Sequence, residues 1–260
     1  MNLPIVSIIT PSYNSSKFIE ETIASVQAQT YTCWEMLITD DGSTDNSLEI
    51  IKVISTNDSR VKFFSINNSG PAVARNNSIK HAKGKYLAFL DSDDLWMPKF
   101  LAKSIKFVSN SEGFVFSSYK RCNEITLKEQ YKDFIVPNKV TYMDILKTNS
   151  ISCLTAFIDI EQLGKEFMPE VMYRQDMGLW LKYLKKIKYA KGMRETLAIY
   201  RIRNNSHSRN KKKLLKPQWF FYREVENLNI ITSIYLTYYL PRNSFVSFVI
   251  IYHKTLIYGV

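Results

Sequence analysis

The chain has 260 residues, of which 45% are hydrophobic and 23% charged, a composition typical of folded globular proteins rather than disordered ones. Its three cysteines form no close pair, which argues against a disulfide framework or a zinc site and favours a reducing compartment. No stretch reaches the roughly 18 apolar residues of a membrane-spanning helix. The N-terminal residues lack the pattern of a signal peptide, and we expect neither feature.

The formal net charge of +11 is concentrated in one region. Residues 182–223 contain fourteen Lys and Arg side chains against one acid, Glu195, which leaves the remaining chain close to neutral. A basic region favours an anionic partner, either nucleic acid or anionic phospholipid. No nucleic-acid module is recognisable, and the aromatic-rich stretch after residue 216 suits a membrane surface. We therefore expect no nucleic-acid partner and peripheral binding to anionic membranes; the alternative is that the aromatic residues pack on the sheet as a helical cap.

The first hundred residues alternate between strand-like and helix-like segments. β-Branched runs predict strands, and apolar residues at helical spacing predict helices. We expect Ser15 and Ser16 to cap the first helix, and Gly84 to end the third in a left-handed conformation. The expected strands are residues 5–10, 34–39, 61–66 and 86–90, with a helix after each of the first three.

The second half is less regular, but it continues the same kind of structure. The alternation predicts an α/β fold: a mostly parallel central sheet flanked by helices, with a C-terminal helical extension. In such sheets ligands bind at the carboxyl ends of the strands, where the polar clusters 11–14, 40–42 and 91–94 fall. The later elements are expected at 113–119 and 151–159 (strands), 173–187 (helix), 189–203 (strand or hairpin) and from 216 onward (helices).

Two of these polar clusters have a chemical interpretation. Asp91-Ser92-Asp93-Asp94 brings together carboxylates that repel one another, so they either spread into solvent at an acidic turn or share a divalent cation.

The first strand-to-helix turn has no glycine, which excludes a dinucleotide-binding motif and a P-loop. That turn offers Tyr13 for stacking on a base, and the next offers Asp41 as an acceptor for a base N–H; a packed loop tyrosine and a turn acid are the alternatives.

Seven sequence blocks carry a family resemblance. Five of them, in order within residues 4 to about 98, are VSIITPSYN (6–14), QAQTY (27–31), DDGSTD (40–45), ARNN (74–77) and GKYLAFLDSDD (84–94). Two weaker ones follow, QDMGLWL (175–181) and LAIYR (197–201). Together they resemble the family 2 inverting glycosyltransferases of bacterial polysaccharide and lipopolysaccharide synthesis. The resemblance implies a GT-A fold, a nucleotide-diphosphate sugar donor, and Mg²⁺ or Mn²⁺ as cofactor.

The resemblance also implies roles for individual residues. Asp91-Ser92-Asp93 stands where the family has its DxD motif, so Asp93 would ligate the metal and Asp91 would support the metal or hold the ribose. Arg75 would contact the phosphates, and a surface arginine is the alternative. The nucleotide contacts implied are Pro11, Tyr13, Asn14, Asp41, Arg75 and Asp91.

Asp176 is the catalytic base that the resemblance implies, because the acceptor hydroxyl must lose its proton as it attacks. The family often has Glu-Asp here, whereas this chain has Gln175 in the first place. The alternative is an acid placed at a helix N-terminus for the dipole. Trp180 is expected in the core, and His207 on an exposed loop outside the metal site.

We therefore expect a metal-dependent, inverting hexosyl- or N-acetylhexosaminyltransferase. It would move sugar from a UDP-sugar to a growing cell-surface polysaccharide or lipid-linked glycan, in the cytoplasm at the inner face of the bacterial inner membrane. Residues 1–100 would bind the nucleotide sugar, residues 101–215 the acceptor, and residues 216–260 would form a helical, membrane-associating segment. The alternative is a non-catalytic protein of the same fold that binds nucleotide sugar or membrane.

Overall fold

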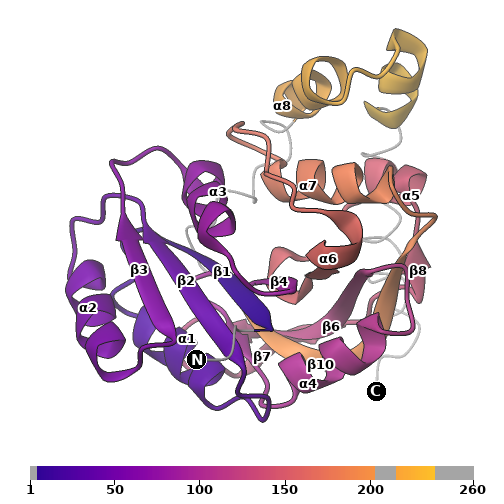
Figure 1. Ribbon diagram of the computed structural model, residues 1–260. Coiled ribbons are helices and arrows are strands. Elements are labelled where there is room, and N and C mark those ends of the chain that lie inside the picture. Colours follow the sequence, from indigo (N-terminus) through magenta and orange to yellow (C-terminus); the bar gives the residue numbers. More distant parts are fainter. Residues whose placement is uncertain (1–4, 203–214, 238–260) are drawn as a thin grey trace, which may run out of the picture.

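A single sheet runs through the computed structural model, which describes residues 5–202 and 215–237 (Figure 1). Its strands are β1 Val6–Ser12, β2 Trp34–Asp40, β3 Val61–Ser65, β4 Tyr86–Phe89, β5 Leu95–Trp96, β6 Phe114–Asn123, β7 Glu129–Phe134, β8 Lys139–Val140, β9 Phe157–Asp159 and β10 Ala190–Ile202. Their order is β3-β2-β1-β4-β9-β6-β10-β5, with β7 beside β6 and β8 beside β10. Among the described strands the parallel pairings are the longer ones, which confirms the mostly parallel sheet.

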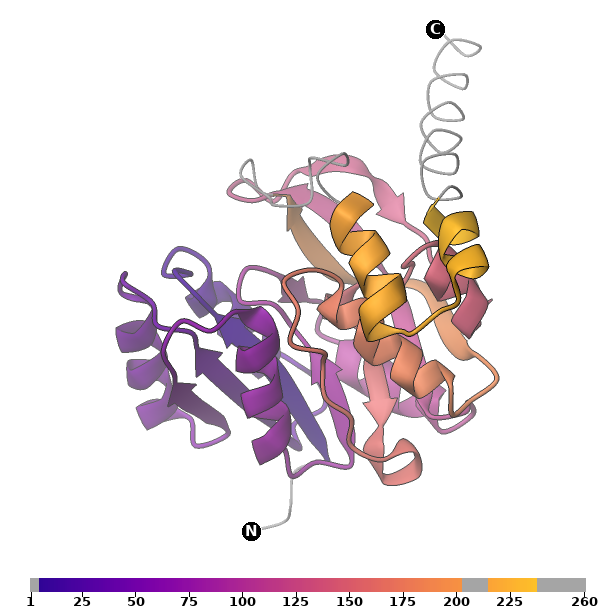
Figure 2. The same cartoon turned by 90° about the horizontal axis from the view of Figure 1, so that it is seen from above.

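Helices cover both faces of this sheet (Figures 1 and 2). They are α1 Ile19–Gln27, α2 Ser47–Asn57, α3 Pro71–His81, α4 Phe100–Val108, α5 Tyr142–Lys147, α6 Ile160–Leu163, α7 Gln175–Leu184 and α8 Leu215–Phe220, with a 3₁₀ turn η1 at Cys153–Thr155 and a π-helical turn η4 at Phe221–Val225. A last helix begins at residue 230. The α/β class predicted from the sequence is therefore confirmed.

Side chains on the two faces of the sheet pack into two separate hydrophobic cores, because successive strand residues point to opposite sides of a sheet. Ile9 and Leu37 pack in one core with α3, α5 and α7. Ile8 and Met36 pack in the other with α1, α2 and α4. Strands buried on both faces read as continuous apolar runs, which is why they were visible in the sequence. Trp180 is fully buried in the first core, as predicted.

Two predicted helix boundaries are wrong, and each has a local reason. Ser15 and Ser16 do not cap α1, which begins at Ile19; their N–H groups donate instead to Ser47 Oγ and to an acid in the loop before α2. Gly84 does not end α3 in a left-handed conformation, because the helix already ends at His81. Gly84 is required for a different reason: a Cβ there would lie 2.7 Å from the backbone nitrogen of Ser7.

The C-terminal helices pack over α7, in gold in Figures 1 and 2. Phe221, Tyr222 and Leu236 are at most 1% exposed and belong to the first core. The Tyr222 hydroxyl donates to the carbonyl of Leu146 in α5 (2.6 Å). This part of the chain is helical, as predicted. Within the described ranges no helix is both long enough and apolar enough to span a bilayer.

Candidate active site

Loops that follow the parallel strands β1, β2 and β4 lie at one edge of the sheet (Figure 1). β1 ends at Ser12, which pairs with Asp40 at the end of β2. Leu90, just after β4, donates its N–H to the Ile9 carbonyl of β1 (3.1 Å). The carboxyl ends of these strands are therefore neighbours. The predicted residues at or beyond these ends are Pro11, Tyr13, Asn14, Asp41, Asp91 and Asp93.

Asn14 connects the first of these loops to the second. Its N–H donates to Ser43 Oγ (3.0 Å), and its Oδ1 accepts from the N–H of Thr44 (2.8 Å). Its φ of 47° is left-handed, a conformation that asparagine tolerates. The neighbouring Tyr13 is 50% exposed, so its ring is open to a ligand, whereas Pro11 lies within β1. The nucleotide contacts of these three residues stay predictions.

Asp41 connects the end of β2 to the loop before α3. It is 4% exposed, and its two carboxylate oxygens accept from the N–H groups of Ser69 (2.7 Å) and Gly70 (2.9 Å). Each carboxylate oxygen has a second lone pair, so these bonds do not prevent a further one. Asp41 can therefore hold the loop and accept from a base N–H together; the base contact stays a prediction.

Arg75 reaches from α3 to the loop after β4. It is 8% exposed, and its Nη2 donates to Oδ1 of Asp91 at 2.5 Å. Burial alone would lower the pKa of the guanidinium, but the charges of Asp91 and Asp176 raise it, so Arg75 is a permanent cation. Its Nε is buried and has no acceptor among the described residues. Arg75 is therefore not the surface arginine of the alternative interpretation; its phosphate contact stays a prediction.

Asp94 differs from the other acids of its cluster because it is a buried structural residue, 1% exposed. Its Oδ1 accepts from the N–H of Arg201 (2.8 Å), while its Oδ2 is buried without a donor among the described residues. Burial raises the pKa of Asp94 well above its ordinary value, and the charges of Asp93 and Asp91 raise it further. Asp91 and Asp93 are partly exposed, so these two carboxylates are the ones open to a ligand.

Asp176 lies in the first turn of α7, which begins directly after Arg174, a residue with a φ of 67°. The Nδ2 of Asn149 donates to Oδ2 of Asp176 (2.9 Å) and orients this carboxylate. Gln175, which stands where the family often has an acid, donates its side-chain amide to the carbonyl of Val171 (2.8 Å). Asp176 is thus the positioned acid of this helix start.

Cys153, in η1, is a buried thiol beside these charged groups. Burial raises the pKa of this thiol well above its ordinary value; the charge of Arg75 lowers it, and those of Asp91, Asp176 and Asp94 raise it. With its pKa raised, the thiol is uncharged at neutral pH. We call Arg75, Asp91 and Asp176, which lie close enough to this thiol to act on it, the charged cluster; they come from α3, the loop after β4 and α7.

Several residues of this region were not predicted as site residues. Asn149 and Cys153 belong to no motif, so the sequence offers no signal for them. Tyr200 is part of the block at 197–201 and could have been found there. Burial and the charges of the acids 91, 93 and 94 raise its pKa to about 12. Its ring lies 6.0 Å from that of Tyr119. His207 lies outside the described residues.

The donor set at this edge fits a hard divalent cation, because such ions prefer carboxylate oxygens. Asp91 and Asp93 supply these oxygens from the loop after β4. No group of three or more His, Cys, Asp or Glu side chains within residues 5–202 and 215–237 has the geometry of a metal site. The metal role of Asp91 and Asp93 stays a prediction.

The sequence matches the family described as Glycosyl transferase family 2 over residues 7–158. The chain belongs to this family. It is accordingly a glycosyltransferase, and the resemblance of the opening motifs is confirmed. A Bacillus subtilis protein named for teichuronic acid biosynthesis, TuaG, is 44% identical over 88% of this chain and 92% of its own length.

Two further comparisons agree with this. An Escherichia coli protein, WfgD, named UDP-Glc:alpha-D-GlcNAc-diphosphoundecaprenol beta-1,3-glucosyltransferase, is 38% identical over 83% of this chain and 84% of its own length. The solved structure of S. aureus TarS 1–349 in complex with UDP-GlcNAc superposes with a TM-score of 0.67 at 21% identity, over 84% of this chain and 66% of that one. At that identity the structural likeness shows the fold alone, which is the GT-A fold expected from the sequence.

Proposed function

We propose that this chain transfers a hexosyl or N-acetylhexosaminyl group from a UDP-sugar to a growing cell-surface polysaccharide or a lipid-linked glycan, with inversion. The observation that carries the proposal is the buried Arg75, which pairs with Asp91 at 2.5 Å at the carboxyl edge of the sheet. The name of WfgD specifies a UDP-sugar and a diphosphoundecaprenol acceptor, and TarS was solved with UDP-GlcNAc. Both names support a UDP-sugar donor and a lipid-linked acceptor.

The donor lies against the loops of residues 1–100 in this proposal. Tyr13 stacks on the base, a role supported by its exposed ring. Asp41 accepts from a base N–H with its remaining lone pairs, while Pro11 and Asn14 line the same loop. Arg75 faces the phosphates with a buried Nε–H that has no acceptor among the described residues. A phosphate oxygen would satisfy that donor.

Mg²⁺ or Mn²⁺ is the cofactor in this proposal, held by Asp93 with Asp91 supporting it or holding the ribose. Carboxylate oxygens are the ligands that a hard divalent cation prefers, and these two side chains would hold it. A mannosyltransferase of Pyrobaculum calidifontis, solved with GDP-Man and Mn²⁺, has a TM-score of 0.67 at 17% identity, over all of this chain and 77% of that one. A divalent cation supplies Lewis-acid neutralisation of the charge that develops on the leaving diphosphate.

Asp176 is the base in this proposal. It takes the proton of the acceptor hydroxyl as that oxygen bonds to the anomeric carbon, and the bond to the diphosphate breaks on the opposite face. Asn149 holds one carboxylate oxygen, which fixes the direction of the other. Attack from the opposite face inverts the anomeric configuration of the donor.

The acceptor binds to residues 101–215 in this proposal, near the start of α7. A cavity of about 480 Å³ lies between the segment before α7 and α8. Tyr173, which lines it, is three residues before Asp176. A lipid-linked acceptor could place its sugar at Asp176 and its apolar part toward this cavity. The lining residues are Glu170, Val171, Met172, Tyr173, Lys216, Pro217, Phe220 and Phe221.

Residues 216–260 bind the inner face of the bacterial inner membrane peripherally in this proposal, as part of an enzyme that works from the cytoplasm. One face of the described part packs on the core through Phe221, Tyr222 and Leu236. Other side chains of this segment are apolar and exposed, and the segment lies beyond α7 on the side away from the sheet (Figure 1). In this proposal the buried side chains cap the core while the exposed ones contact the membrane. The exposed residues, between 36% and 78% accessible, are Trp219, Phe220, Ile230, Ile231, Ile234 and Tyr235.

A donor screen that measures release of nucleoside diphosphate tests the enzymatic proposal. We expect release from UDP-sugars in Mg²⁺ or Mn²⁺, and loss of release in chelator. Asp93→Ala should lower the rate by orders of magnitude, and Asp176→Asn should lower kcat by about 10² to 10⁴ with donor binding kept. Asp58→Asn, directly after the C-terminal end of α2 and in none of the predicted site positions, is the control and should keep the rate. Turnover in chelator would reject the metal role, and donor binding without turnover in any mixture would favour a non-catalytic protein.

Sedimentation with liposomes tests the membrane proposal. The full chain should sediment with anionic vesicles at low salt and less at high salt, because screening weakens the attraction of basic residues. Replacing Ile231 and Ile234 together by Asp should reduce sedimentation. Val53→Asp is the matched control, since Val53 is 63% exposed on α2. A protein that stays in the supernatant with anionic vesicles at low salt does not bind membrane.

A further inference from the structure

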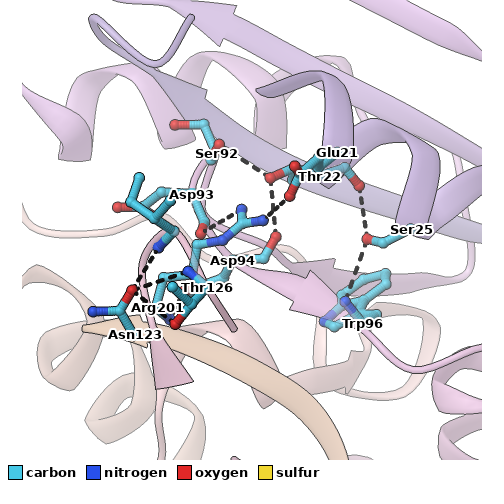
Figure 3. Close-up of polar contacts among 11 residues, drawn as sticks. Glu21, Thr22, Ser25, Ser92, Asp93, Asp94, Trp96, Asn123, Thr126 and Arg201 are labelled. Atoms are coloured by element: carbon cyan, nitrogen blue, oxygen red, sulfur yellow. Dashed lines mark hydrogen bonds and ion pairs between the residues drawn. The ribbon is translucent and has the colours of Figure 1, made fainter. Parts of the chain in front are cut away.

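Arg201 lies near the end of β10 and is buried, with 2% of its surface exposed. Its guanidinium points toward the loop after β4 and toward α1, as Figure 3 shows. Nη1 donates to the carbonyl of Asp93 (3.0 Å), and Nη2 forms an ion pair with the carboxylate of Glu21. The ring of Phe18 lies 5.1 Å from the guanidinium carbon. One side chain therefore connects β10, α1 and the acidic loop.

The backbone of Arg201 holds the same loop at a second point. Its N–H donates to Oδ1 of Asp94 (2.8 Å). The N–H of Asp94 in turn donates to the carbonyl of Asp91 (3.1 Å), which closes the loop as a turn. The side chain and the backbone of one residue thus fix two successive positions, 93 and 94. A shift of β10 would move both.

Helix α1 holds the loop from the other side. The hydroxyl of Thr22 lies within hydrogen-bond distance of the carbonyls of Ser92 (3.1 Å) and Asp94 (2.9 Å), and it donates its one proton to either (Figure 3). Thr22 follows Glu21, so one turn of α1 supplies this hydroxyl and the counter-ion of Arg201. Residues 91–94 are therefore held between α1 and β10.

Packing alone does not explain why an arginine is buried at position 201. A guanidinium loses water on burial and must recover the free energy from its partners. Here the counter-ion is a surface group, since the side chain of Glu21 is 62% exposed, and Nε of Arg201 has no acceptor among the described residues. An apolar side chain would fill this volume without that loss of hydration. What it could not do is hold the carbonyl of Asp93.

We propose that Arg201, with Glu21 as its counter-ion, is a positioning residue that fixes the loop 91–94 so that Asp91 and Asp93 present their carboxylates at a set separation. For its catalytic consequence this rests on the proposed function, in which these carboxylates hold a divalent cation. Arg201 itself touches neither the cation nor the substrate in this proposal. It acts through the backbone of Asp93 and the side chain of Asp94.

Four variants of the full chain test this: Arg201→Met, Arg201→Lys, Glu21→Gln and, as a control on the same exposed turn of α1, Glu20→Gln. The first measurement is hydrogen exchange of the peptide that spans 91–94, without ligand. The second is the affinity for Mn²⁺ in the presence of UDP, from the electron paramagnetic resonance signal of free Mn²⁺. The third is the affinity for UDP alone.

Arg201→Met should speed exchange selectively in the 91–94 peptide and weaken Mn²⁺ binding at least tenfold, with UDP affinity unchanged within twofold. Arg201→Lys should recover part of the loss, because an ammonium can pair with Glu21 but lacks the planar fork of donors. Glu21→Gln should show the same selective change, several-fold in size, and Glu20→Gln none.

Unchanged Mn²⁺ affinity and unchanged exchange in a folded Arg201→Met protein overturn the proposal, and so does faster exchange spread evenly over the whole chain. If Arg201→Met does not fold, Glu21→Gln decides, because an exposed side chain leaves no cavity when it is replaced. If the wild-type protein binds no Mn²⁺ with UDP, the metal part of the proposed function fails, while selective exchange still supports or rejects the positioning role.

Discussion

The ion pair between Arg75 and Asp91 gives the sharpest quantitative test of the charged cluster. The Arg75 side chain is 10% exposed and the Asp91 side chain 28%, so the pair is partly shielded from water. Replacing Arg75 by Met keeps an unbranched apolar side chain but leaves the carboxylate of Asp91 without its cation. We expect the Arg75→Met protein to fold with a clearly lower free energy of unfolding.

The size of the loss follows from the burial. Removing one partner of a buried ion pair costs about 3 to 5 kcal/mol, because the other charge stays behind without compensation. Asp91 retains some contact with water, so we expect the lower end of that range, about 3 kcal/mol. A second change, Asp91→Asn, removes the stranded charge. The double variant should therefore recover part of the stability that Arg75→Met loses.

Urea unfolding at pH 7, followed by tryptophan fluorescence, measures these free energies. Lys52→Met is the matched control, since Lys52 pairs with Glu49 at 2.8 Å but the two side chains are 44% and 71% exposed. Exposed pairs contribute up to about 1 kcal/mol, so the control should lose far less. Equal losses in the two variants, or a loss below about 1 kcal/mol for Arg75→Met, would refute the reasoning.

Three further changes test other parts of the structure. Tyr13→Ala should raise the KM for the donor several-fold with little effect on unfolding, because the exposed ring stacks on the base in the proposed function. Burial raises the pKa of Glu35, but hydrogen bonds led by that from Lys62 outweigh it and the net pKa lies below the ordinary value of 4.5. Its contribution is therefore complete above that pH and lost on acidification, so Glu35→Gln should cost about 2 kcal/mol at pH 7 and progressively less below pH 4.5 in urea unfolding. Gly192→Ala should cost about 2 kcal/mol or more, measured in the same way, because its Cβ would overlap the carbonyl oxygen of Pro137.

The first half of the fold could be predicted because its information is local. Strands buried on both faces appear in the sequence as apolar runs, and the helices between them appear as apolar residues at helical spacing. The predicted bounds of β1 to β4 therefore agree with the observed bounds to within one or two residues. The predicted strand at 151–159 is instead the turn η1 followed by the short β9. β9 pairs antiparallel with both β4 and β6, across more than forty residues of sequence. No local period encodes such a pairing.

The residues of the candidate site also fall into two groups, those that sequence motifs identify and those that only tertiary packing brings together. Residues 11–14, 41, 91 and 93 lie close to strand ends, and these residues and Arg75 of α3 fall within family motifs, so they were visible in the sequence. Asn149 and Cys153 reach the site only through the packing of η1 and α7. Arg201 stands in a recognisable block, but its ion-pair partner Glu21 lies 180 residues away. The sequence identifies such a residue; only the three-dimensional structure identifies what it holds.

The three carboxylates that follow β4 now have separate physical explanations. Asp94 is buried, which raises its pKa and disfavours its charged form. Asp91 is paired with the buried cation Arg75. Asp93 has its carbonyl fixed by Arg201 and its side chain partly exposed. Like charges can share this turn because burial disfavours the charged form of Asp94 and the guanidinium of Arg75 compensates the charge of Asp91. Asp91 and Asp93 are the two partly exposed carboxylates of the turn. That division is why Asp93→Ala is expected to affect turnover most with the fold kept, whereas changes at Asp94 should affect the fold first.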